Sequence, residues 1–133
     1  MRLWHIDLIP YLPKGQLLAQ WRELNSIFKK QDKHILINYI YKTDKRPLLY
    51  YSMKVLEEIK QRGYKVKSLE NFNRFFESVP YVEGATWLEH NQEYLTICYY
   101  NLKEKYIRCQ KDFTKDVWEK LDRFYKKRKD VIV

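Results

Sequence analysis

The sequence predicts an all-α protein, a single compact helical domain over residues 1–133 with an extended N-terminal arm packed beside the first long helix. Three observations lead to this prediction. Apolar residues recur at helical spacing along most of the chain. Only three glycines occur, each at an expected break, and 45% of the residues are hydrophobic and 17% aromatic. That composition is typical of a folded chain, and a chain of this length can bury a core without disulfides.

The first part of the chain predicts the arm and the helix beside it. Residues 1–12 are apolar and bounded by Pro10 and Pro13, which favours an extended segment. From about residue 14 to 30, apolar residues then recur with the spacing of a helix packed on a core. These residues are Leu17, Trp21, Leu24 and Phe28.

The remaining segments predict four further helices and one ambiguous stretch. The segment "KHILINYIYK" (33–42) is compatible with either a buried helix or a strand, because it is apolar at nearly every central position. The four expected helices lie within 46–63, 68–80, 86–108 and 114–128. Pro47 and Gly63 delimit the first of them, and Ser68 is the expected N-cap of the second. The third is expected to be the longest, with an inward stripe of Leu88, Leu95, Cys98, Leu102 and Tyr106.

The charge balance predicts a polyanionic partner. There are 26 Lys and Arg against 17 Asp and Glu, a net charge of +9. A small basic domain typically meets nucleic acid or an anionic membrane surface, although a merely soluble basic protein has the same balance. No signal peptide and no apolar run of about 20 residues is visible, so we expect a cytoplasmic protein that does not enter a membrane.

Cysteines and sequence motifs give no indication of a cofactor or a metal. Cys98 and Cys109 have neither metal-ligand spacing nor the numbers of a disulfide framework. No glycine-rich phosphate loop and no His-Glu-x-x-His motif occurs. The histidines His5, His34 and His90 are scattered, so they could converge with Glu23 on a metal or, as the simpler interpretation, each form a local hydrogen bond.

Two groups of polar residues are candidates for a functional site. Arg22 and Glu23 lie off the apolar stripe of the first helix, where they form either a solvated charged pair or part of a site. The C-terminal segment "DRFYKKRKD" places aromatic residues among basic ones, a pattern that suits DNA phosphates and bases but also an ordinary helix with solvated charges. Its candidate DNA-binding residues are Arg123, Lys126, Lys127 and Arg128.

The segment "QLLAQWREL" (16–24), followed by Lys33–His34, resembles the pyrimidine-dimer DNA glycosylase family of phage endonuclease V. The resemblance extends to "EEIKQRGYKVK" (57–67) and, more weakly, to residues 88–106. The opening "MRLWHIDLIPYLP" looks like a distinct bacterial branch of that family. The resemblance implies an all-α fold and a monomeric DNA repair enzyme without a cofactor. Its substrate would be duplex DNA that contains a pyrimidine dimer or a related damaged base.

The resemblance also implies a mechanism. In that family the α-amine of the N-terminal residue attacks C1′ of the damaged nucleotide and forms an imine, and a carboxylate assists glycosylase and AP-lyase steps. Glu23 matches the carboxylate, and Arg22 matches an arginine that grips DNA. Lys33 and His34 match a basic pair near DNA, and Arg2 matches an arginine beside the nucleophile, with an offset of one residue.

The chain departs from the family pattern at the nucleophile. The phage enzyme loses its initiator Met and exposes a Thr, but a large second residue such as Arg2 normally blocks that removal. The expected amine is therefore that of Met1. His5 and Gln16 are candidates for lining a pocket beside it. Two alternatives stay open at this point: a non-catalytic nucleic-acid-binding protein of the same fold, or a hydrolase that uses a metal on the histidines.

Overall fold

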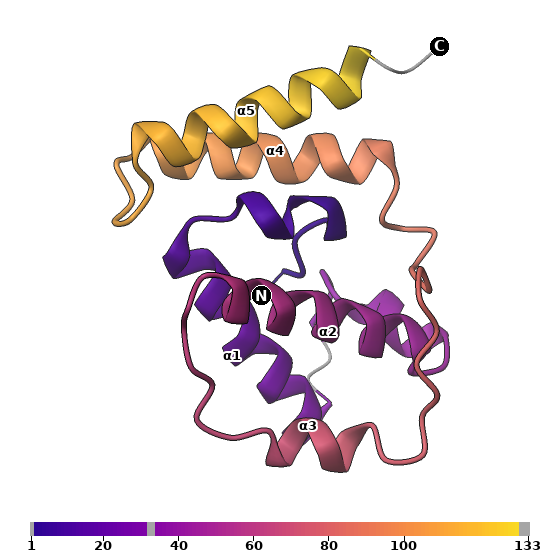
Figure 1. Cartoon of the computed structure of the whole chain (residues 1–133). Helices are drawn as coiled ribbons and strands as arrows, with labels where there is room; N and C mark the ends of the chain where they lie inside the picture. The colour runs from indigo at the N-terminus through magenta and orange to yellow at the C-terminus, as the bar shows by residue number, and fades with distance from the viewer. Residues whose placement is uncertain (1, 32–33, 131–133) are drawn as a thin grey trace.

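The computed structural model describes residues 2–31 and 34–130, with the side chains up to Arg128, and its described part is all-α without a β-strand (Figure 1). In the described residues, two short 3-10 helices and five α-helices follow one another. Their bounds are η1 Ile6–Tyr11, α1 Lys14–Lys30, η2 Asn38–Lys42, α2 Arg46–Gln61, α3 Glu70–Phe75, α4 Gln92–Ile107 and α5 Lys115–Asp130. The predicted fold class is therefore confirmed.

The helices stack in layers around the N-terminal segment. In Figure 1, α4 and α5 lie side by side at one end of the molecule and α3 lies at the other. Between them, η1 packs against both α5 and α2, and α1 packs against α2 and α3. The described start of the chain, from Arg2 onward, is therefore enclosed between the α4–α5 pair and the α1–α2 pair.

The N-terminal arm is ordered, but it is extended only as far as His5. The following residues form η1, because the His5 ring accepts a hydrogen bond from the Asp7 backbone N–H at 3.1 Å and so caps the turn. Leu3 and Leu8 are fully buried. The arm thus contributes side chains to the core. It packs beside α1 as predicted, but its extended part ends at His5 and does not reach residue 12.

The prediction for α1 is confirmed, and its capping explains where it ends. The helix spans Lys14–Lys30 and buries Leu17, Leu24 and Phe28. Gln31 adopts a left-handed φ of 51° and donates its backbone N–H to the Ile27 carbonyl. This is a common way for a helix to end, because it satisfies a carbonyl that has no partner within the helix.

The ambiguous stretch 33–42 is neither a long helix nor a strand. In its described part, a turn leads into the short η2, in which Ile37 and Ile40 are buried while Ile35 is 82% exposed. Burial at positions i and i+3 suits the three-residue repeat of a 3-10 helix. This apolar segment therefore has one buried side and one side that faces the solvent.

The starts of α3 and α4 also differ from the prediction. The Ser68 hydroxyl accepts a hydrogen bond from the Glu70 backbone, but the N-cap position belongs to Leu69. Helix α4 begins only at Gln92, because the Asn91 side chain accepts from the Tyr94 backbone N–H at 2.9 Å. Leu88 precedes the helix and is 93% exposed, so it does not belong to the inward stripe. With 16 residues, α4 is also shorter than the 17-residue α1.

Candidate active site

The centre of the candidate site is the side-chain amide of Gln20, which joins the N-terminal arm to Glu23. Its Oε1 accepts a hydrogen bond from the Trp4 backbone N–H at 2.9 Å. Its Nε2 donates to the Arg2 carbonyl at 3.1 Å and to the Glu23 carboxylate at 3.0 Å. Because Gln20 and Glu23 are three residues apart on α1, their side chains lie on the same face of the helix.

Glu23 is a half-buried carboxylate beside the backbone of Arg2. Burial raises the pKa of Glu23 above its ordinary value, because a charged carboxylate is less stable away from water. Hydrogen bonds from the Arg2 backbone and from Gln20, together with the charge of Arg22, lower the pKa of Glu23 in part. Such a carboxylate can stabilise a nearby positive charge, and it can also exchange a proton closer to neutral pH than an exposed one.

Two tyrosines, the fully buried Tyr51 and the half-buried Tyr94, complete the surroundings of the arm. The Tyr51 hydroxyl lies 2.7 Å from the Trp4 carbonyl oxygen and 2.9 Å from Gln20 Oε1. The Tyr94 hydroxyl donates to the Leu3 carbonyl oxygen. Burial raises the pKa of Tyr51 and of Tyr94, so both remain neutral phenols that can donate a hydrogen bond.

A comparison with protein families shows to which family the chain belongs. The pyrimidine dimer DNA glycosylase family matches residues 1–71, more than half of the sequence. The chain belongs to the pyrimidine dimer DNA glycosylase family. Comparisons with curated proteins and with solved structures gave no significant match. In this glycosylase-family chain the matched part contains Gln20, Glu23 and Tyr51, whereas Tyr94 lies beyond it.

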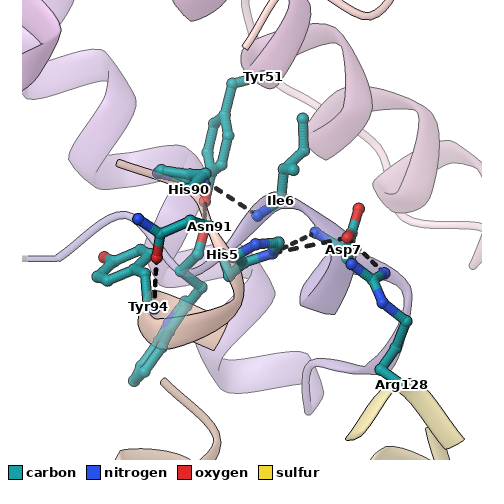
Figure 2. Close-up of polar contacts among 9 residues, drawn as sticks. His5, Ile6, Asp7, Tyr51, His90, Asn91, Tyr94 and Arg128 are labelled. Carbon is teal, nitrogen blue, oxygen red and sulfur yellow. Dashed lines mark hydrogen bonds and ion pairs between the residues drawn. The ribbon is translucent and has the colours of Figure 1, made fainter. Parts of the chain in front are cut away.

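The histidines of the glycosylase-family chain each form hydrogen bonds, which are local for His5 and His34 and join distant parts of the sequence for His90. His90 Nδ1 accepts from the Ile6 backbone N–H at 3.2 Å, and its Nε2 lies 2.7 Å from the Tyr39 hydroxyl. His5 and His90 stack with ring centroids 5.5 Å apart (Figure 2). Burial and, to a smaller extent, the neighbouring His5 lower the pKa of His90 to about 3. His90 is thus neutral and carries its proton on Nε2.

No metal site emerges from these histidines. His34 is exposed, and its Nδ1 accepts from the Leu36 backbone N–H at 3.2 Å. Among the described residues, no group of three His, Cys, Asp or Glu side chains could hold a metal ion. The hypothesis of a metal-dependent hydrolase therefore has no support in this part of the chain.

The C-terminal basic residues divide into two kinds. Arg128 donates from Nη1 to the Asp7 carboxylate of η1 at 2.6 Å (Figure 2), and Lys126 pairs with Asp122 at 2.9 Å. Phe124 stacks on Tyr11 with ring centroids 4.5 Å apart. Arg128 thus joins α5 to η1, whereas the ion pair of Lys126 lies within α5, and Lys126, Arg123 and Lys127 are exposed.

The other predicted site residues are spread over the molecule. Arg22 is exposed on α1, next to Glu23. Arg2 is half-buried, and its guanidinium lies 5.8 Å from the centre of the Tyr94 ring. Gln16 donates to Gln110 Oε1 at 2.8 Å and has no contact with the arm among its hydrogen bonds. The predictions for Met1 and Lys33 lie outside the described residues.

A cavity of about 580 Å³ lies elsewhere, between η1, α2 and α5. Asp7, Lys54 and Arg128 are among its lining residues, and Glu23 is not. The surroundings of Glu23 are a better candidate for the active site than this cavity. They combine a carboxylate whose pKa is raised with a chain segment that is held in place by hydrogen bonds. Among the described residues, no helix is both long and apolar enough to cross a membrane.

The sequence interpretation gave no role in the site to Gln20, Tyr51 or Tyr94. Gln20 could have been found, because it precedes Glu23 by three residues and is a polar residue near the apolar stripe of α1. Tyr51 and Tyr94 are two of twelve tyrosines, and no local pattern distinguishes them.

Proposed function

We propose that this protein is a DNA repair glycosylase with an associated AP-lyase activity. Its substrate would be duplex DNA containing a pyrimidine dimer or a related damaged base, and it would act as a cytoplasmic monomer without a cofactor. The observation that carries the proposal is the hydrogen bonding of the Arg2 backbone to Gln20 and Glu23. Through this contact, the carboxylate that would assist the reaction lies beside the backbone of Arg2, the residue next to the proposed nucleophile.

The proposed nucleophile is the α-amine of Met1. An α-amine has a pKa of about 7.7–8.0, whereas that of a lysine is about 10.4, so far more of the α-amine is unprotonated at neutral pH. Consecutive Cα atoms are about 3.8 Å apart, so covalent connectivity keeps an amine one residue before Arg2 within reach of the site. The offset of one residue from the family pattern is therefore compatible with the mechanism.

The proposed reaction proceeds through an imine. The amine nitrogen forms a bond to C1′, and the glycosidic bond breaks, so that its electron pair leaves with the base, which takes up a proton. The nitrogen then loses a proton, and the C1′–O4′ bond opens. The electron pair of that bond goes to O4′, which takes up a proton, and the nitrogen lone pair forms the C=N bond of a protonated imine. Removal of a proton from C2′ forms a carbon–carbon double bond and expels the 3′ phosphate, which cuts the strand.

Glu23 would act in this sequence in two ways. As a carboxylate it stabilises the positive charge that develops on the sugar and on the imine nitrogen. Because burial raises the pKa of Glu23, the group is also suited to taking up and returning protons during elimination. Exposed Arg22, Arg123 and Lys127, together with the net charge of +9, would supply phosphate contacts.

The imine predicts a covalent adduct. Incubation with duplex DNA containing an abasic site or a pyrimidine dimer, in the presence of borohydride, should reduce the C=N bond and leave protein linked to DNA. Glu23→Gln and an N-terminal extension should each abolish the adduct while DNA binding persists. Glu77→Gln is a matched control, because Glu77 is exposed outside the site.

The absence of an adduct from a protein with a free N-terminus, across several lesions, would refute the imine mechanism. If such a protein still bound duplex DNA with a steep salt dependence, the non-catalytic binding protein would be the better description.

A further inference from the structure

Side chains from four separate parts of the chain hold the backbone of residues 2–6. Each contact gives a hydrogen-bond partner to a backbone carbonyl or N–H group that would otherwise have none. The side chains that make these contacts are Gln20 of α1, Tyr51 of α2, Tyr94 of α4 and His90 of the loop before α4. The arm is thus fixed by residues that are up to 91 positions away in the sequence.

Tyr94 binds two consecutive residues of the arm. Its hydroxyl donates to the Leu3 carbonyl oxygen, and its ring lies 5.8 Å from the Arg2 guanidinium. A guanidinium at this distance from an aromatic ring is attracted by the negative potential of the ring face. One side chain of α4 therefore limits the movement of the residue whose backbone meets Glu23.

Tyr51 links the arm to the amide that contacts Glu23. The tyrosine is fully buried, and its hydroxyl proton is shared between the Trp4 carbonyl oxygen and Gln20 Oε1. Because Oε1 accepts this bond, the Gln20 amide must turn Nε2 toward Arg2 and Glu23. Tyr51 thus determines both the position of Trp4 and the orientation of the amide.

We propose that Tyr51 and Tyr94 are positioning residues that hold the start of the chain against Glu23 in the geometry required for attack on the sugar. This inference rests on the proposed function. The two hydroxyls act through the backbone of the arm and do not touch the DNA. Their effect on the rate is expected to be large, because a displacement of about 1 Å in a reacting group can slow a reaction about 100-fold.

The hydroxyls can be removed while the rings are retained. The test variants are Tyr51→Phe, Tyr94→Phe and their combination. The control is Tyr125→Phe, because Tyr125 is 5% exposed and its hydroxyl lies 3.1 Å from Thr96 Oγ1, in the α4–α5 pair and away from the arm. All variants are assayed well below their melting temperatures.

Three quantities are measured on the full chain. They are the single-turnover rate of borohydride adduct formation with abasic-site duplex DNA, the Kd for the same DNA, and the hydrogen exchange of the Trp4 and Ile6 amides. We expect each test variant to form the adduct at least about 10-fold more slowly with Kd changed less than about twofold. We also expect faster exchange in the arm, and we expect Tyr125→Phe to behave as the wild type.

The outcomes separate this inference from the proposed function. If the wild type forms the adduct and both test variants form it at the wild-type rate, the positioning role is wrong and the glycosylase proposal stands. If the wild type forms no adduct, the glycosylase proposal fails. In that case, unchanged exchange of the Trp4 and Ile6 amides in both variants would also overturn the positioning role, and accelerated exchange would support it.

Discussion

Replacement of Gln20 by Leu is expected to destabilise the protein far more than its position on a helix suggests. Gln20 is 1% exposed, and its amide takes part in four hydrogen bonds. Leucine has a similar volume and a high helix propensity, so the substitution removes these bonds without leaving a large cavity or weakening α1. The change therefore isolates the contribution of the amide.

The magnitude follows from the partners of the amide. At about 0.5–1.5 kcal/mol per hydrogen bond, four bonds contribute about 2–6 kcal/mol. Half-buried Arg2 and Glu23 can turn to water, whereas the buried Trp4 N–H is left without a partner. We therefore expect a loss of about 2–4 kcal/mol. An unfolding entropy of about 2.1 cal/mol/K per residue converts this loss to a decrease in Tm of about 7–14 °C for 133 residues.

The assay is thermal and urea unfolding of Gln20→Leu beside Gln16→Leu. Gln16 lies one turn earlier on the same helix and makes a single half-buried hydrogen bond, to Gln110. The control should lose about 1 kcal/mol or less. A difference in Tm of about 3 °C corresponds to about 1 kcal/mol, the contribution expected of one hydrogen bond. If the Tm values of Gln20→Leu and of the control differ by no more than this, the amide does not hold the arm.

The other predictions concern charges. Glu23→Gln should raise the free energy of unfolding at pH 7–8. The pKa of Glu23 is raised in the folded protein, so its ionisation favours the unfolded chain. The gain should vanish below pH 4.5, where Glu23 is protonated in both the folded and the unfolded state. A gain that persists at low pH in urea titrations would refute this explanation. His90→Asn should flatten the pH dependence of stability between pH 6.5 and about 3, because neutral His90 takes up its proton more readily when unfolded; an unchanged slope in the same titrations would contradict it. A double-mutant cycle on Asp7 and Arg128, which are 38% and 41% exposed, should give a coupling of about 0–1 kcal/mol, and a value above about 2 kcal/mol would mean that the pair is far better shielded. Arg22→Ala should reduce the slope of log K for duplex DNA against log salt by about 1, and an unchanged slope would exclude a phosphate contact.

Helical periodicity was a reliable guide where one face of a helix is buried. The predicted apolar stripe and the predicted bounds of the first helix agree closely with α1, because polar residues separate the apolar ones at every turn. The same approach was less successful for α4, which has apolar residues on its exposed face as well, such as Ile97 and Tyr100. Its start depends on the Asn91 cap, a local hydrogen bond that the apolar pattern does not reveal.

The candidate site was predictable only in part. Glu23 and Arg22 were found through a short segment that resembles a family, and the match of that family over residues 1–71 confirms the membership. The roles of both residues stay predictions. The C-terminal basic run illustrates the limit of the approach, because its pattern did not indicate the ion pair that Arg128 forms with Asp7. The DNA-binding role of Arg128 stays a prediction.

The sequence by itself determined the all-α class, the extent of α1, the position of Glu23 on it and the family. These properties depend on neighbours along the chain, since spacing fixes which residues share a helix face. The tertiary structure alone decided that Gln20, Tyr51 and Tyr94 hold the backbone of residues 2–4 near Glu23. The contacts of Trp4 with Tyr51 and of Leu3 with Tyr94 join residues 47 and 91 positions apart. Helix packing brings such residues together, and periodicity within one helix carries no information about which face of another helix it will meet.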